Sequence, residues 1–175
     1  MNVSLHPRVL LLFVVGLVWI ISTRHDTPTL PQIIDGHRMP FIQLTDVSEN
    51  VVSTNDSLGT PVVYTLWTTW CPACSANMPV LNQLVPEMEA RGIRMVAVNQ
   101  GETLMQIQSH LLHSSIELDI WQDPQRQMGM LLQANDLPST IFVDANGVIR
   151  LLYRGPITPT LFRTMATVLT QEEYR

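Results

Sequence analysis

Short apolar runs and amphipathic stretches alternate along the chain from residue 40 onward. Residues 61–67 (PVVYTLW) and 93–98 (IRMVAV) are rich in β-branched side chains without polar alternation, which is typical of central strands. Apolar residues between these runs recur at helical spacing, at Leu81, Leu84, Val85 and Met88. The predicted helix contains Pro79 and Pro86, so we expect it to kink or restart.

The second half of the chain continues the alternation of helices and strands. We expect helices around residues 104–111, 127–133 and 161–169, and a strand pair at 140–143 and 148–153. The residues between the paired strands, DANG, are typical of a hairpin turn. This order of elements predicts an α/β fold with a mixed central sheet and helices on both faces.

A second strand pair precedes the first central strand. Residues 41–44 and 50–53 surround a polar segment, which indicates an N-terminal β-hairpin extension. The compact domain is therefore expected to span residues 40–175, with this hairpin at its start. Residues 24–39 contain two prolines and a glycine without hydrophobic periodicity, so we interpret them as a linker.

An apolar segment occupies the amino terminus. Residues 9–21 are thirteen consecutive apolar positions, counting Gly16, and polar residues follow from Arg24. A membrane-spanning helix needs about 20 apolar residues, whereas the apolar part of a secretory signal has about 7 to 15. Because no good cleavage site follows, we interpret residues 1–23 as a signal anchor, with a cleaved signal peptide as the alternative. Either interpretation places the rest of the chain outside the cytoplasm.

Composition excludes several functional classes. The chain has 175 residues, of which 46% are hydrophobic and 14% charged, so it is too apolar for a disordered protein. Its net charge is -5 and it contains no lysine, so no basic patch is expected and no nucleic-acid partner either. Two cysteines are too few for a disulfide-rich framework.

Cys71 and Cys74 lie three positions apart, between a predicted strand and a predicted helix. Free N–H groups at a helix N-terminus favour a thiolate at Cys71, and Cys74 follows one turn later on the same side. Such a pair can exchange disulfides, with Cys71 attacking and Cys74 resolving the mixed disulfide. Two buried structural thiols or half of a zinc site are the alternatives. Zinc would need two further Cys or His ligands, and the sequence has no second CxxC or HxxxH.

The motifs around the cysteines follow a characteristic order. They are WTTWCPAC at 67–74, VAVN at 96–99, Asp123-Pro124, LPSTIFVD at 137–144 and GVI at 147–149. With these motifs, residues 40–169 resemble the thioredoxin fold. More narrowly, the chain resembles the membrane-tethered, extracytoplasmic TlpA/ResA-type thioredoxins, which include the reductases of cytochrome c maturation.

The resemblance implies a role for each site residue. It makes Cys71 the attacking thiol, Cys74 the resolving thiol and Pro138 a cis proline that faces them. A cis bond there leaves the backbone of Leu137 free to pair with a client strand. The residues that we expect to bind clients are Trp70, Pro72, Leu137 and Pro138. No cofactor or metal is expected beyond the redox-active Cys71–Cys74 disulfide.

The resemblance also implies partners and a location. The partners are the thiols or disulfides of client proteins, apocytochrome c among them, and a membrane electron donor that recharges the protein. The expected location is the periplasm, with the domain either anchored to the inner membrane or secreted. In this interpretation the chain reduces client disulfides.

Two positions depart from the family pattern. Many relatives carry a buried acid three residues after the second cysteine, where this chain has Asn77. Thioredoxins carry an aspartate six residues before the first cysteine, where this chain has Thr65. Neither side chain can accept a proton from Cys74 as a carboxylate would. Water, or a more distant acid such as Glu87, remains as the acceptor.

Two other functions are weighed against thiol exchange. A metal (copper) chaperone would use the same two thiols, and further soft or imidazole side chains occur at Met128, Met130, His110 and His113. A peroxidase of the peroxiredoxin type would combine a proline with a threonine before its cysteine. Thr68 matches that threonine, but Tyr64 stands where the proline would be.

Overall fold

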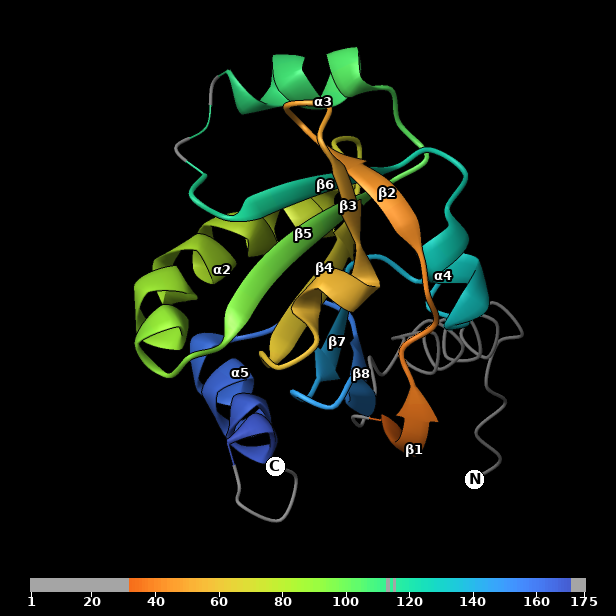
Figure 1. Ribbon diagram of the computed structural model, residues 1–175. Helices are drawn as coiled ribbons and strands as arrows, with labels where there is room; N and C mark the ends of the chain where they lie inside the picture. Colours follow the sequence, from red (N-terminus) through yellow and green to blue (C-terminus); the bar gives the residue numbers. More distant parts are fainter. Residues whose placement is uncertain (1–31, 113, 115, 171–175) are drawn as a thin grey trace, which may run out of the picture.

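The computed structural model describes residues 32–112, 114 and 116–170 and contains one mixed sheet (Figure 1). The strand order is β1-β8-β7-β4-β5-β6-β2-β3, and β4, β5 and β6 run parallel while the other pairings are antiparallel. The strands are β1 (Gln32–Arg38), β2 (Gln43–Asp46), β3 (Val51–Ser53), β4 (Val62–Trp67), β5 (Arg94–Gln100), β6 (Asp119–Asp123), β7 (Ser139–Val143) and β8 (Val148–Arg154).

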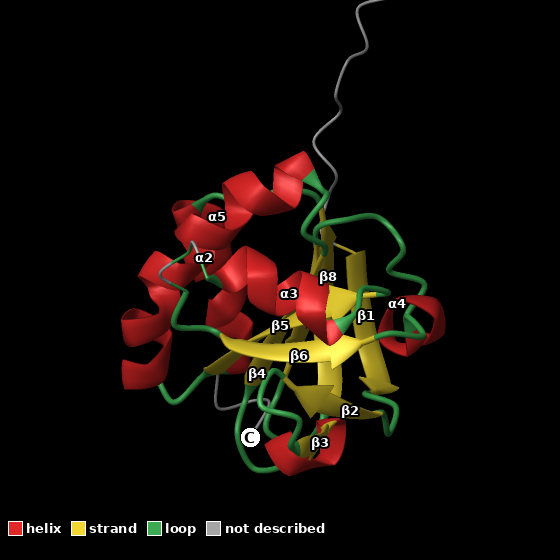
Figure 2. Cartoon of the chain, turned by 90° about the horizontal axis from the view of Figure 1, so that it is seen from above, coloured by secondary structure: helices red, strands yellow, loops and turns green. Residues whose placement is uncertain are grey.

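Helices cover both faces of the sheet. They are α2 (Pro72–Ala90), α3 (Leu104–Leu111), α4 (Gln127–Leu131) and α5 (Pro159–Ala166), with short 3₁₀ helices η1 (Thr54–Ser57) and η2 (Thr167–Leu169). Side chains of α2, α3 and α5 pack into one core cluster, and those of α4 pack into the other. Figures 1 and 2 show α2 and α5 on one side of the sheet and α4 on the opposite side. The predicted thioredoxin fold is confirmed.

Strand β4 leads directly to the cysteines. All six of its residues are buried, because β5 and β7 flank it and helices cover both of its faces. Val63 and Trp67 contribute to the cluster that contains α2, whereas Tyr64 and Leu66 contribute to the other cluster. Successive side chains of a strand point to opposite faces, so burial on both faces explains why the run lacks polar alternation.

Helix α2 runs without interruption from Pro72 to Ala90. The expected restart at Pro79 or Pro86 is therefore wrong. Both prolines are exposed, so water can hydrate the backbone carbonyls that lose an N–H partner. The buried positions of the helix include Leu81, Leu84, Val85 and Met88, the set that the apolar spacing predicts.

Two strands differ from the expectation based on sequence. Residues 32–38, within the segment 24–39 interpreted as a linker, form β1, so the linker interpretation is wrong there. β1 pairs antiparallel with β8, from Gln32 opposite Leu152 to Arg38 opposite Val148. The hydrogen-bond partners of β1 lie on β8, more than a hundred residues later in the chain. The sequence of residues 32–38 alone therefore does not reveal the pairing. The sequence pattern also fails to predict β6.

The predicted N-terminal hairpin is present as β2 and β3. It joins the main sheet, because β2 pairs antiparallel with β6. The amino-terminal segment 1–23, interpreted as a signal anchor or signal peptide, lies outside the described residues. Among the residues that the structure describes, no helix is both long and apolar enough to cross a membrane.

Candidate redox-active site

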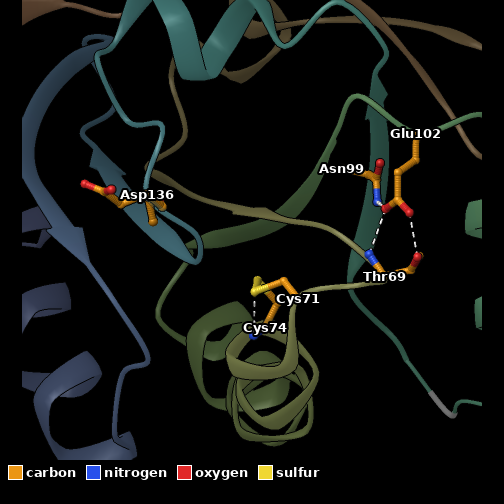
Figure 3. The surroundings of a disulfide bond; sticks show 7 residues. Thr69, Cys71, Cys74, Asn99, Glu102 and Asp136 are labelled. Carbon is orange, nitrogen blue, oxygen red and sulfur yellow. Dashed lines mark hydrogen bonds between the residues drawn. A yellow bond between two sulfur atoms is a disulfide. The ribbon is translucent and has the colours of Figure 1, made fainter.

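The two cysteines lie where β4 ends and α2 begins (Figure 3). Cys71 is the N-cap of α2 and Pro72 is the first helical residue, as the sequence predicts. The Cys71 Sγ accepts a hydrogen bond from the Cys74 backbone N–H at 3.1 Å, and the Cys71 carbonyl accepts one from Ser75 N–H at 3.0 Å. The two sulfurs form a disulfide, so the structure represents the oxidised protein.

The two cysteines differ in accessibility. Cys71 is 6% exposed and Cys74 is fully buried at 0%. The neighbours of Cys71 are open to solvent: Trp70 is 71% exposed and Pro72 is also exposed. A protein that approaches this end of α2 therefore meets Trp70 first and reaches the sulfur of Cys71 before that of Cys74.

The second part of the site comes from the start of β7. The Leu137–Pro138 peptide bond is cis, as the resemblance implies. Leu66 of β4 pairs with Ser139 of β7, so Pro138 lies one position beyond this pair, at the end of β4 that leads to the cysteines. Pro138 is buried and Leu137 is half-buried. The sheet thus brings these two residues to the same end of β4 as the cysteines.

A buried carboxylate that the sequence analysis does not single out lies beside the loop before Cys71. Glu102 Oε2 accepts hydrogen bonds from the Thr69 backbone N–H and from Asn99 Nδ2, each at 2.7 Å. Glu102 Oε1 accepts a bond from the Thr69 hydroxyl at 2.5 Å. Figure 3 shows this cluster on one side of the disulfide and Asp136 on the other. Its sequence signal is an acidic residue two positions after the end of the buried strand β5.

The residues discussed as proton acceptors have other roles. Asn77 is buried, and its Oδ1 accepts a hydrogen bond from the Ile157 backbone N–H at 2.9 Å. Its Nδ2 is a buried donor without a partner. Glu87 forms an ion pair with Arg163 at 2.8 Å and lies about 20 Å along α2 from Cys74, so it cannot take a proton directly from that cysteine.

The side chains considered for copper are dispersed in the structure. Met128 is buried in the core and Met130 is exposed. The His110 ring packs against the Trp67 ring at 5.6 Å between centroids, and His113 lies outside the described residues. Within residues 32–112, 114 and 116–170, no group of three His, Cys, Asp or Glu side chains is arranged to hold a metal ion.

Sequence relatives of this chain include thiol–disulfide oxidoreductases and interchange proteins. The chain is 29% identical over 123 residues to the thiol-disulfide oxidoreductase ResA of Geobacillus kaustophilus, covering 70% of this chain and 71% of the relative. It is 30% identical over 141 residues to the thiol:disulfide interchange protein DsbE of Pseudomonas fluorescens biotype C, covering 79% and 76%. These relatives agree with the resemblance that the motifs indicate.

A solved structure and a family model extend the comparison. A crystal structure described as a thiol:disulfide interchange protein DsbE from Chlorobium tepidum superposes with a TM-score of 0.70 at 25% identity. The match covers 79% of this chain and 97% of that protein. The model of the AhpC/TSA family matches residues 36–152, which include both cysteines and Pro138. The chain therefore belongs to the AhpC/TSA family.

Proposed function

We propose that the chain is an extracytoplasmic thiol–disulfide oxidoreductase that reduces disulfides in client proteins. The observation that carries the proposal is the Cys71–Cys74 disulfide at the N-terminus of α2, with Cys71 as the N-cap. Relatives that match over most of the chain bear the names of thiol–disulfide oxidoreductases and interchange proteins. The reducing direction rests on the resemblance to the TlpA/ResA-type proteins.

The reaction begins from the dithiol form. The Cys71 thiolate attacks one sulfur of a client disulfide, which forms a Cys71–client mixed disulfide and releases the second client sulfur as a thiolate that takes up a proton. Cys74 then loses its proton and attacks Cys71 Sγ. This step breaks the Cys71–client bond, forms the Cys71–Cys74 disulfide and releases the client sulfur that was bonded to Cys71 as a thiolate, which takes up a proton. The client gains two electrons and two protons, and the chain loses the same number.

The local geometry favours Cys71 as the attacking thiol. Its sulfur accepts the Cys74 backbone N–H and lies at the positive end of the helix dipole, and both effects stabilise a thiolate. The complete burial of Cys74 suits a resolving thiol, because an external disulfide cannot reach it. We expect the Cys71 thiol to titrate below the free-cysteine value of about 8.5.

We also propose a client site and a recharging route. Trp70 and Pro72 present exposed apolar surface next to Cys71, and Leu137 and Pro138 supply a backbone edge at the end of β4. Apocytochrome c is the client that we propose from the resemblance. The oxidised form seen here returns to the dithiol by a two-electron thiol donor, which we place in the membrane beside an anchor formed by residues 1–23.

A trapping experiment tests the function. A Cys74→Ser variant, reduced and mixed with a peptide that contains a CxxCH disulfide, should accumulate a Cys71–peptide mixed disulfide detectable by mass. Wild-type protein should instead release the dithiol peptide. A copper chaperone would lose Cu(I) binding in the variant and trap nothing, and a wild-type peroxidase would consume peroxide with a small thiol as reductant and no peptide present. Fractionation and N-terminal sequencing test the anchor: a soluble chain that begins after about residue 22 would show a cleaved signal instead.

A further inference from the structure

Glu102 has a buried acidic side chain near the cysteines, and the proposed thiol exchange assigns it no role. It is 5% exposed and lies between the end of β5 and α3. No lysine occurs in the chain, and no arginine within the described residues forms an ion pair with Glu102. A buried carboxylate without a counter-ion costs stability unless hydrogen bonds compensate for the lost hydration. Its partners therefore indicate its role.

All three hydrogen bonds to the carboxylate connect Glu102 to groups around the active-site loop. Two come from Thr69, through its backbone N–H at 2.7 Å and its hydroxyl at 2.5 Å. Thr69 lies two residues before Cys71, in the loop between β4 and α2. The third comes from Asn99 Nδ2 at 2.7 Å, near the end of β5. Hydrogen bonds to a carboxylate are stronger than those between neutral groups, so this cluster fixes the loop firmly.

Glu102 itself is held by the neighbouring strand. Its backbone carbonyl accepts a hydrogen bond from Gln122 Nε2 at 3.0 Å, and Gln122 belongs to β6. The preceding residue, Gly101, donates its N–H to the Asp123 carbonyl at 2.9 Å. The following residue, Thr103, caps α3. The carboxylate therefore reaches the loop from a support formed by β5, β6 and α3.

Buried polar atoms without a hydrogen-bond partner occur around the cluster of Glu102, Thr69 and Asn99. Four buried side-chain atoms lack a hydrogen-bond partner within the described residues, and three of them belong to Trp67, Thr68 and Asn99. Asn99 is a member of the cluster, and the other two residues immediately precede Thr69. Buried unpaired polar atoms are rare in proteins and require an explanation. Thr68 belongs to the loop, whereas Trp67 and Asn99 lie at the ends of β4 and β5 next to it, so a loop and strand ends held for reactivity at the expense of optimal hydrogen bonding provide one.

We propose that Glu102 is a positioning residue for thiol exchange. Its carboxylate clamps Thr69 so that Trp70 and Cys71 are held at the start of α2, with the Cys71 sulfur directed toward the incoming client. Glu102 acts through the loop and does not touch the reacting atoms. The inference rests on the proposed thiol chemistry and adds a residue that determines how readily Cys71 reacts.

Two variants of Glu102 separate position from charge. In Glu102→Gln, the amide oxygen can accept the Thr69 and Asn99 N–H groups while the amide nitrogen donates to the Thr69 hydroxyl, so the clamp survives without its charge. In Glu102→Ala, all three bonds are lost. We expect Glu102→Ala to slow client reduction by about tenfold to about a hundredfold and to shift the pH profile of Cys71 alkylation. Glu102→Gln should stay close to wild type in both measurements.

The matched control is Glu87→Gln, which removes a partly exposed carboxylate from the far part of α2 and should change neither measurement. If Glu102→Ala does not fold, Thr69→Val removes one clamp bond and should give a smaller change in the same direction. Wild-type alkylation kinetics for both Glu102→Ala and Thr69→Val would overturn the proposal, as would equal losses in Glu102→Ala and Glu102→Gln. Alkylation needs no client, so failure of wild-type protein to reduce the client would count against the proposed function and not against the clamp.

Discussion

Glu102 and Asp144 are both buried carboxylates, but they lie in different parts of the fold and have different kinds of partner. Asp144 lies in the turn between β7 and β8 and accepts backbone bonds from Asn146 and Val148 at 2.9 Å. It also pairs with Arg150, whose Nε and Nη2 lie at 2.8 and 2.7 Å from its Oδ2. All these partners lie within six residues of Asp144. Glu102 forms no ion pair with an arginine of the described residues, and it binds Thr69, 33 residues away in sequence.

The difference separates a stabilising function from a positioning one. Asp144 has short-range partners and a counter-charge, so its bonds close a hairpin turn. Glu102 joins two segments that meet only in the folded protein, one of which leads to the reactive cysteine. Loss of Asp144 should therefore lower stability while sparing thiol chemistry, and loss of Glu102 should affect thiol chemistry directly.

Removal of the attacking thiol should have the largest effect. Cys71→Ser leaves a hydroxyl that is a poor nucleophile at neutral pH, so turnover of a disulfide peptide should fall to the uncatalysed rate. Cys74→Ser should also lose turnover but should trap the peptide. Mass spectrometry of the two reaction mixtures distinguishes these outcomes. A mixed disulfide formed by Cys71→Ser through Cys74 would reverse the assignment of the two thiols.

Breaking the Asp144 pair should have the largest effect on stability. Asp144→Ala removes the carboxylate that pairs with Arg150, whose side chain is 16% exposed, and that accepts two turn N–H groups. We expect a loss of about 2 to 4 kcal/mol in the free energy of unfolding, measured with urea. Peptide reduction per folded molecule should stay at the wild-type rate. A large loss of activity in the folded fraction would remove the contrast with Glu102.

Restoring an acid next to Cys74 should accelerate resolution of the mixed disulfide. Asn77→Asp keeps an oxygen for the Ile157 N–H and replaces the unpaired Nδ2 with a second oxygen. Burial raises the pKa of a carboxyl group, so this aspartate can accept the Cys74 proton near neutral pH. We expect release of the client from Cys71 to become about tenfold faster in rapid-quench experiments.

The control for this variant is Gln83→Glu, which adds a carboxylate on the exposed side of the same helix. It should leave the resolution rate unchanged. An Asn77→Asp protein that folds and resolves no faster than wild type would show that proton transfer from Cys74 does not limit the reaction.

Truncation of Trp70 should have the smallest effect on stability. Its side chain is 71% exposed, so Trp70→Ala should change the free energy of unfolding by less than about 0.5 kcal/mol. Client binding should weaken by about fivefold or more, seen as a higher KM for the peptide with little change in kcat. Leu58→Ala removes another exposed apolar side chain from a part of the molecule that we do not assign to the site. Equal KM changes in both variants would argue against a client contact at Trp70.

The sequence predicts most of the fold because local patterns coincide with tertiary burial. Residues 61–67 are apolar without alternation because β4 is covered on both faces, and α2 keeps its apolar stripe despite two prolines. Strand β6 escapes prediction because its sequence, DIWQD, begins and ends with an acid. Strand β1 escapes because its partner β8 lies more than a hundred residues away and its segment contains a glycine.

The site residues also differ in how far the local sequence predicts them. The CxxC spacing is local, so Cys71 and Cys74 are found directly from the sequence. Glu102 acquires its role only when β4 and β5 pair in parallel and bring Thr69 next to the end of β5. Glu87, weighed from the sequence as a more distant proton acceptor, lies too far along α2 to take the Cys74 proton directly.

The reduction potential of the Cys71–Cys74 couple tests the central claim most directly. Equilibration of the protein with defined thiol–disulfide buffers, read by alkylation and mass, gives this potential. A reductase of client disulfides should lie near the value of about -270 mV that is typical of thioredoxin, or below it. A value near about -120 mV, typical of a strong oxidase, would contradict the account and reverse the direction of electron flow.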